Sequence, residues 1–86
     1  MASKVVVFSQ AKKDFQSLPV SMQKRMAEAL RQLGEFPLLR IGVRKLKPPF
    51  AGYRKRVGDH RILFDYDDAV QTVYVRGVRN RKDAYR

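Results

Sequence analysis

Arginine side chains concentrate around one short segment of the chain, Gly52–Arg61, in which the residues are Gly-Tyr-Arg-Lys-Arg-Val-Gly-Asp-His-Arg. The Gly-Asp dipeptide at positions 58–59 predicts a two-residue β-hairpin turn, which would bring Arg56 directly opposite Arg61 on one face of the ladder. Arg54 would share that face, because side chains alternate along a strand. Like charges opposite each other destabilise a ladder, so this arrangement favours an anion between them, and guanidinium groups bind phosphate well.

The composition extends this expectation to the whole chain. Its 86 residues include 19 Lys and Arg against 8 Asp and Glu, which gives a formal net charge of +11 and a pI of about 10.6. Such a balance favours a polyanionic partner, nucleic acid first and an acidic protein second. A run of charge is also typical of a solvated surface. The excess of Arg over Lys in the hairpin and near the C-terminus favours phosphate contact, because Arg forms two hydrogen bonds to phosphate and stacks on bases.

Basic residues outside the hairpin form two further groups. No acidic residue lies between Phe36 and Gly58, and a second basic run follows near the C-terminus. The residues that we expect to contact RNA are Arg44, Lys45, Lys47, Arg79, Lys82 and Arg86. Tyr85 lies among the last arginines, where its ring would either anchor the chain end or stack on an exposed base.

Missing residue types exclude several classes of protein. The chain has no cysteine, which excludes disulfides, thiolate nucleophiles and cysteine-based zinc sites and agrees with a reducing cytoplasm. His60 is the only histidine, so a nuclease built on two histidines is excluded, and we expect a structural role for this ring. No apolar run approaches the ~18 residues of a membrane span. The first ten residues have no signal-peptide pattern. We expect a cytoplasmic protein without membrane contact, cofactor or metal.

Cleavage of RNA is compatible with these residues. The 2′-hydroxyl of RNA can attack its own phosphate, so neither a metal nor a nucleophile from the protein is required. Arg54, Arg56 and Arg61 would stabilise the charge of the phosphorane, whereas proton transfer by arginine is poor because its pKa is above about 12. Such an enzyme would depend on strong positioning of its substrate, for instance by another macromolecule.

Hydrophobic periodicity predicts the elements that would position these residues. The expected strands are Lys4–Phe8, a short one at Lys45–Lys47, the hairpin strand before Gly58, His60–Tyr66, and Gln71–Val78 after a turn at Asp67-Asp68. The expected helices are one with Ser9 as its N-cap that ends before Pro19, and one over Ser21–Leu33 with Gly34 as its C-cap.

The order β-α-α-β-β-β predicts one α+β domain over residues 1–86. A helical hairpin would pack on one face of a small three- to four-stranded, mainly antiparallel sheet. The side chains expected beneath the helices are those of Val57, Ile62, Phe64 and Tyr66. Lys55 falls on the same side, where it would need a strand end or edge from which its ammonium could reach water.

The chain resembles the RelE/ParE superfamily of bacterial and archaeal toxins, specifically its RelE-like branch. The resemblance covers nearly the whole length, and its most specific parts are Gly52–Phe64 and Arg81–Arg86. It implies a RelE-like fold and a toxin of a type II toxin-antitoxin system, a ribosome-dependent mRNA endonuclease that inhibits translation. It also implies a hetero-oligomer with a cognate antitoxin. The alternatives are a ParE-like inhibitor of DNA gyrase on the same fold and an inactive RNA-binding domain.

The resemblance implies catalytic roles for five residues. Arg54 and Arg56 match two basic residues on one strand, of which the second is the proposed general base. Arg61 matches the arginine that holds the scissile phosphate. Arg81 matches a tail arginine suggested to protonate the leaving 5′-oxygen, with Arg79 as an alternative. Tyr85 matches a tyrosine that stacks on an mRNA base.

Three positions depart from the family pattern. Arg56 stands where lysine is common, Asn80 replaces a histidine that often precedes the tail arginine, and Lys55 replaces an apolar residue. Arginine is a weaker proton acceptor than lysine, so the first departure affects the proposed base but not the contact with phosphate.

Overall fold

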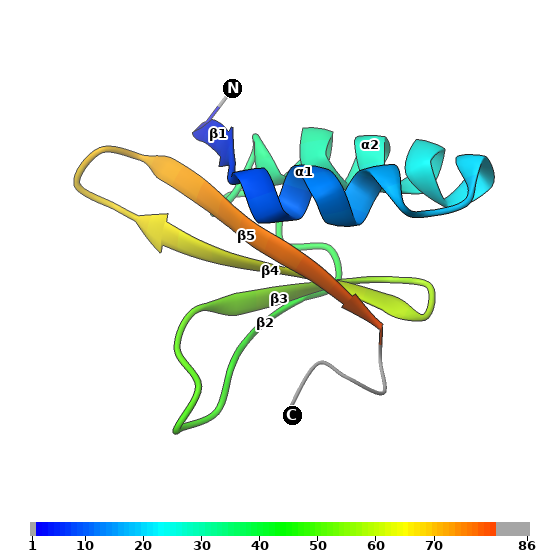
Figure 1. The fold of residues 1–86 in the computed structure, drawn as a ribbon. Helices are drawn as coiled ribbons and strands as arrows, with labels where there is room; N and C mark the ends of the chain where they lie inside the picture. The colour runs from blue at the N-terminus through cyan, green and yellow to red at the C-terminus, as the bar shows by residue number, and fades with distance from the viewer. Residues whose placement is uncertain (1, 81–86) are drawn as a thin grey trace.

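The computed structural model describes residues 2–80, which form two helices and five strands. In chain order the elements are β1 (Lys4–Val7), α1 (Ser9–Gln16), α2 (Val20–Leu33), β2 (Val43–Lys45), β3 (Tyr53–Val57), β4 (His60–Asp67) and β5 (Thr72–Asn80). Both helices lie on one side of the sheet, and its other side is left open (Figure 1). The predicted α+β class and the helical hairpin are confirmed. No helix in the described part of the chain is long and apolar enough to span a membrane.

The sheet has five strands in the order β1-β5-β4-β3-β2, one more than the upper limit of the prediction. The additional pairing comes from β2, which lies at Val43–Lys45 instead of the predicted Lys45–Lys47 and pairs antiparallel with β3. β1 pairs parallel with β5, and all other pairs are antiparallel. β5 also continues two residues past the predicted end, so Arg79 lies in the sheet and not in a tail.

The helices begin close to their predicted starts, with a different cap on α1. Phe8, and not Ser9, is the N-cap, with extended backbone and no side-chain capping bond. Its N–H donates to Val75 O of β5, while its carbonyl accepts the first helical bond from Lys12 N. Phe8 thus ends the strand and starts the helix in one residue. Gly34 is the C-cap of α2, as predicted, although its φ of −63° is right-handed.

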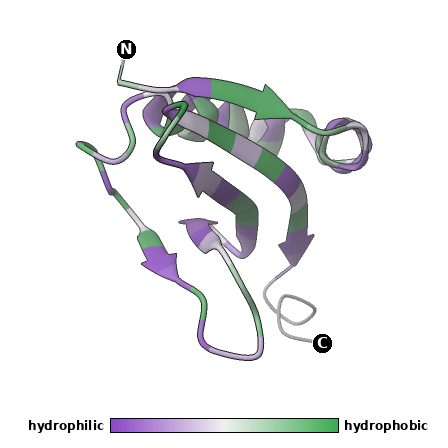
Figure 2. Cartoon of the chain, turned by 90° about the vertical axis from the view of Figure 1, so that its left-hand side faces the viewer, coloured by the Kyte–Doolittle hydropathy of each residue, from purple (hydrophilic) through white to green (hydrophobic). Residues whose placement is uncertain are grey.

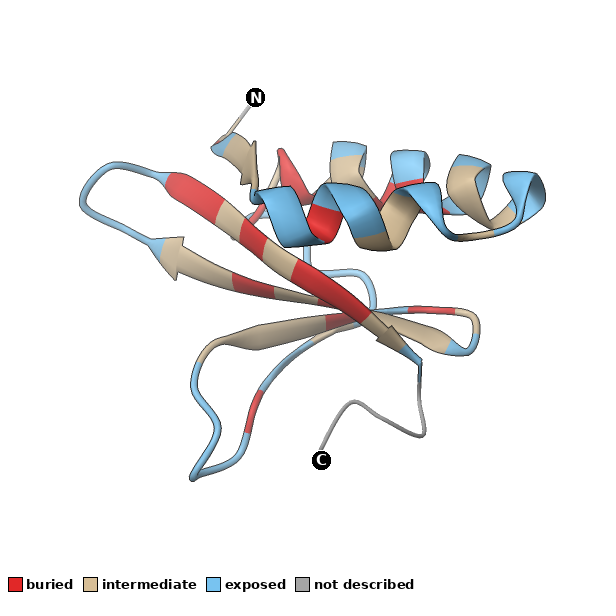
Figure 3. Ribbon diagram, viewed as in Figure 1, coloured by how far each residue is buried: buried red, intermediate tan, exposed pale blue. Residues whose placement is uncertain are grey.

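The core lies between the helices and the inner face of the sheet (Figure 3). Its largest fully buried side chains are Phe36, Phe64, Met26, Leu33, Ile62, Val73 and Val75. Phe36, in the segment after α2, was not predicted as a core residue. Its ring packs edge-on against Tyr53, Phe64 and Tyr66, with centroids 4.9–5.4 Å away. Figure 2 shows that β1 is largely hydrophobic, whereas β5 ends in hydrophilic residues.

Asp14 of α1 joins the helical layer to β5 beyond the end of β1. Its Oδ2 accepts a hydrogen bond from Val78 N at 2.9 Å and one from Arg79 Nη1 at 3.1 Å. Burial alone would raise the pKa of Asp14, but the hydrogen bonds from Val78, Gln10 and Arg79 together hold it below its usual value. Asp14 therefore supplies an acceptor to a backbone N–H that β1 is too short to reach.

We expect Asp14→Ala to destabilise the fold by about 1–3 kcal/mol, because Val78 N–H loses its acceptor in a part-buried position. Asp14→Asn should cost less, since an amide oxygen can still accept that bond. A folded-state pKa below the unfolded value of about 3.9 means that the charge stabilises the fold above that pH, and that this contribution disappears as the pH falls through the folded pKa. Urea unfolding should show the difference in the free energy of unfolding between wild type and Asp14→Asn narrowing as the pH falls below the unfolded pKa of about 3.9. A constant gap at every pH would contradict this assignment.

Candidate functional site

The open face of the sheet carries arginines from three neighbouring strands. Arg56 of β3 pairs with Arg61 of β4, and Arg61 pairs with Arg79 of β5. We call these three residues the arginine row. Side chains paired across neighbouring strands stand on the same face, with Cβ atoms about 4.5–5.5 Å apart. The row therefore concentrates three positive charges in a narrow band that crosses three strands.

The turn at positions 58–59 sets the register of this row. Gly58 has a φ of +59° at the first central position, as a type II′ hairpin turn requires. With this two-residue loop, Val57 pairs with His60 and Arg56 with Arg61. The predicted hairpin and its shared arginine face are confirmed.

Arg79 differs from the other two members because its guanidinium is already bound. Nη1 lies 3.1 Å from Asp14 Oδ2 in an ion pair, and it also donates to Val78 O. Gly77 makes room for this contact, since a Cβ there would lie 2.9 Å from Arg79 Nη1 and 3.0 Å from Asp14 Oδ2. The position of Asp14 beside Arg79 could not be found from local sequence, because 65 residues separate the two.

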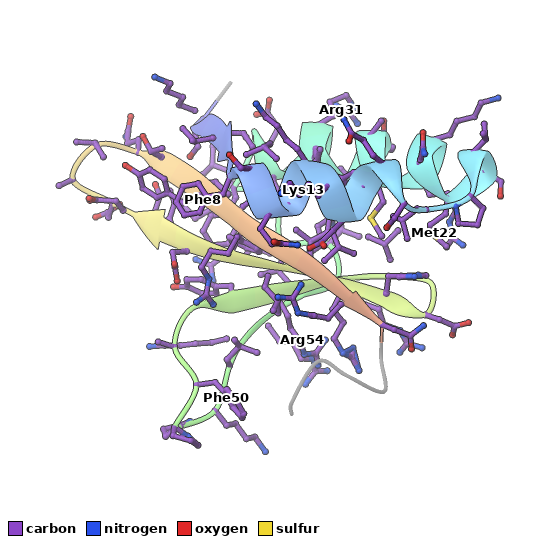
Figure 4. The ribbon with its side chains drawn as sticks, in the orientation of Figure 1. Phe8, Lys13, Met22, Arg31, Phe50 and Arg54 are labelled. Atoms are coloured by element: carbon purple, nitrogen blue, oxygen red, sulfur yellow. The ribbon has the colours of Figure 1, made fainter. Side chains whose placement is uncertain are left out.

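A second pair of arginines lies next to the row. Arg54 of β3 pairs with Arg44 of β2, two residues before Arg56 on the same face. With Arg56 they line a hollow of about 460 Å³ that is completed by Gly42 and Val43. Figure 4 shows Arg54 below the sheet, on the side away from the helices. Two of the predicted catalytic residues thus lie beside one predicted RNA-contact residue.

Lys55, between Arg54 and Arg56, points to the opposite face and is almost completely buried, with 2% of its surface exposed. The expectation that its ammonium reaches water is wrong. Its Nζ donates to the carbonyl of Ile41, and burial lowers its pKa below the usual value. The segment before β2 therefore supplies the partner, and Lys55 does not add to the charge of the open face.

His60 lies on the core side of β4, opposite Val57. Its Nδ1 is buried and has no hydrogen-bond partner among residues 2–80. The ring is therefore on the other face from Arg61, which precludes direct contact with an anion held between the arginines.

Two carboxylates among residues 2–80 are ion-paired with arginines of β5. Asp14 binds Arg79, and Oδ2 of Asp65 lies 3.2 Å from Arg76 Nε. Neither is a free proton acceptor. Within residues 2–80, no three His, Asp or Glu side chains are grouped so as to hold a metal ion.

The other predicted site residues lie in and just after β2 or in the last residues of the sequence. Lys45 ends β2, and Lys47 follows in the loop; both are exposed. The predicted residues that lie outside the described part of the chain are Arg81, Lys82, Tyr85 and Arg86.

A family model decides what kind of protein carries this face. The model described as "ParE toxin of type II toxin-antitoxin system, parDE" matches residues 5–85. The chain belongs to the ParE toxin family. It is therefore a toxin of the RelE/ParE superfamily, as the sequence resemblance predicted, and its system is of type II.

Solved structures of related toxins share the fold of this ParE-family chain. The archaeal RelE-RelB complex from Pyrococcus horikoshii contains a chain 27% identical, with a TM-score of 0.82, over 98% of this chain and 100% of that one. A chain of the RelBE2 toxin-antitoxin complex from Mycobacterium tuberculosis is 26% identical, with a TM-score of 0.67, over 94% of this chain and 100% of that one. A mutant of Escherichia coli RelE in the free state is 21% identical, with a TM-score of 0.73, over 99% of this chain and 88% of that one. A search of curated proteins finds no match.

In this ParE-family toxin, the arginine row should weaken the fold that carries it. We expect Arg61→Ala to raise the melting temperature at low salt by about 1–8 °C, because it removes like-charge repulsion of about 0.2–1 kcal/mol across the ladder. The gain should shrink as added salt screens the charges. Arg31→Ala is a suitable control, since Arg31 is on the helical layer and pairs with Glu28. An Arg61→Ala protein that melts lower at every salt concentration would show that Arg61 stabilises the sheet.

Proposed function

We propose that this toxin is a ribosome-dependent mRNA endonuclease that acts in the cytoplasm and inhibits translation. The observation that carries the proposal is the register of Arg56 opposite Arg61, with Arg54 on the same face. Fixed guanidinium groups on one rigid face suit a phosphate whose negative charge grows during reaction. The resemblance to RelE-like enzymes implies catalytic roles at the same three positions, with Arg56 at the position of the general base and Arg61 at that of the arginine that holds the scissile phosphate.

The reaction would need only atoms of the RNA itself. The 2′-oxygen forms a bond to phosphorus as the bond to the 5′-oxygen breaks, which leaves a 2′,3′-cyclic phosphate and a free 5′-hydroxyl. One proton leaves the 2′-hydroxyl and another reaches the 5′-oxygen. Arg56 stands at the position of the base, and Arg61 stabilises the phosphorane. Arg79 is the less suitable proton donor because Asp14 already binds it, which favours Arg81, with Tyr85 as the stacking residue.

The proposed dependence on the ribosome follows from the poor ability of arginine to accept a proton. A guanidinium group holds its proton at neutral pH, so it is a weak general base. Correct alignment of the 2′-hydroxyl with the phosphate must then supply much of the rate enhancement. A ribosome that holds the mRNA in a fixed conformation would provide that alignment, while free mRNA would not.

The second candidate function is inhibition of DNA gyrase. It is favoured by the description of the matching family model, which names ParE and not RelE. ParE-like and RelE-like toxins share one fold, so the fold does not distinguish them. The arginine row supports the nuclease, because a protein that only blocks gyrase has no need of paired charges around a phosphate.

A cognate antitoxin is the proposed partner. Structural relatives from P. horikoshii and M. tuberculosis were solved as toxin-antitoxin complexes. The net charge of +11 favours rapid capture by an acidic segment, since opposite charges accelerate association. We propose a hetero-oligomer in which this segment covers the open face.

We predict that Arg61→Ala lowers the single-turnover rate of mRNA cleavage on programmed ribosomes by a factor of about 100 to 1,000, the usual effect of removing one preorganised charge contact. Arg31→Ala, with the same loss of charge on the helical layer, should retain the wild-type rate. Mapping of the cut ends should give 2′,3′-cyclic phosphates. A folded, fully active Arg61→Ala protein would remove the hairpin from the active site. Uncut mRNA in arrested cells together with trapped gyrase-DNA complexes would favour the second candidate.

We predict that affinity capture with the Arg61→Ala toxin from its native organism recovers a small protein with an acidic or amphipathic segment. Cells should tolerate expression of this less active variant, and its remaining positive charge still attracts the acidic segment. The complex should dissociate more readily as salt rises, because part of the attraction is between exposed charges. Recovery of ribosomes without any small protein would contradict the proposed partner.

A further inference from the structure

The loop between β2 and β3 forms a second concave surface on the open side of the sheet. Its volume is about 710 Å³, larger than the hollow beside Arg56, and it lies within the ~300–1,000 Å³ that small-ligand sites usually occupy. We call it the loop groove. The residues that line it are Arg44, Lys45, Leu46, Lys47, Pro48, Phe50 and Arg54.

The charged side chains of the loop groove are all positive. Four of its seven lining residues are cations, and none is acidic. Phe50 has 41% of its surface exposed, although a large aromatic side chain is normally buried. Figure 4 shows Phe50 and Arg54 on the side of the sheet away from the helices. A ligand that satisfies this surface needs both negative charge and a flat apolar face.

The loop is held in place by contacts at its base. Leu46 N donates to Gly52 O at 2.9 Å, and Phe50 N donates to Lys47 O at 3.0 Å. Arg76 of β5 donates to Ala51 O at 3.0 Å. Gly52, with a φ of +94°, is required here, because a Cβ would lie 2.8 Å from the carbonyl oxygen of Phe64. These bonds fix the loop before any ligand arrives, which lowers the entropy cost of binding.

We propose that the loop groove binds one unpaired nucleotide of an RNA strand, with its base stacked on Phe50 and its phosphate between Arg44 and Arg54. Single-stranded RNA fits because its bases are free to stack on aromatic rings, whereas a duplex keeps them inside the helix. The neighbouring cations hold the backbone, as they do in other proteins that bind single strands. Stacking on Phe50 and charge contact with the phosphate do not depend on the identity of the base, so the site takes any base.

The loop groove is continuous with the proposed site of cleavage. Arg44 and Arg54 line both this groove and the hollow that includes Arg56. A strand with one nucleotide on Phe50 would therefore lead along β3 to the arginine row. The inference rests on the proposed nuclease function only for the identity of the RNA as mRNA, and binding itself can be measured without cleavage.

The test measures how tightly the full chain binds a short single-stranded RNA that carries 2-aminopurine. The fluorescence of 2-aminopurine falls when its base stacks on another ring. Phe50→Ala should weaken binding about 5- to 100-fold and abolish the quenching, while Phe50→Tyr retains both. Leu38→Ala is the matched control, because Leu38 is 85% exposed and lies outside the groove. Thermal melts of each variant establish that it is folded. An abasic nucleotide should weaken binding to wild type and not to Phe50→Ala.

Two results would overturn the inference. The first is unchanged affinity and quenching in a folded Phe50→Ala protein, with loss of binding only in Arg44→Ala, which would indicate a site for phosphate alone. The second is Phe50-dependent binding of an acidic polypeptide in preference to RNA, which would indicate a protein ligand. Cleavage of mRNA on ribosomes is assayed separately. Phe50-dependent RNA binding without any cleavage would support the groove and reject the proposed nuclease.

Discussion

The register of β3 against β4 is the constraint on which both faces of the sheet depend. Side chains alternate along a strand, so a slip of one residue would exchange the two faces completely. The two-residue turn at Gly58 excludes such a slip. In the observed register Ile62 and Phe64 are fully buried beneath the helices, and Arg56 and Arg61 are directed away from them. One turn therefore determines the core and the charged face together.

Opposing requirements meet in these strands. The buried face contributes stability through apolar contact, about 25 cal/mol for each Å² removed from water, while the open face brings like charges together at some cost. Asp14 neutralises Arg79 at one end of the arginine row. Arg56, at the other end, is exposed. Arg79 thus stabilises the fold through its ion pair, whereas the charge of Arg56 is available to a ligand. This arrangement agrees with a binding site on a rigid scaffold.

Local patterns were sufficient to predict the hairpin and the two helices. The turn dipeptide, the alternation after His60 and the apolar spacing of α2 each lie within a few residues, so the sequence displays them directly. The placement of β2 was less accurate, because three residues at an edge carry almost no periodic signal. The expected contact of Lys55 with water was wrong because its partner, Ile41 O, is a backbone group 14 residues away. Contacts of Asp14 with β5 and of Phe36 with three aromatic rings join distant segments, and no local pattern reveals them. Phe50, an aromatic residue in a stretch without acidic residues, is a signal that the sequence did contain.

The strand order has a consequence for folding during synthesis. β5, the last strand of the described chain, lies between β1 and β4 in the sheet, so β1 has no partner until residues 72–75 have been synthesised. Pairing between such distant segments comes late in folding, because the loop between them must close first. Arg79, at the far end of β5, completes the arginine row only after that. A nascent chain in which β5 has not yet been synthesised therefore lacks both a closed sheet and a complete arginine row, and it cannot act before β5 has been synthesised and paired.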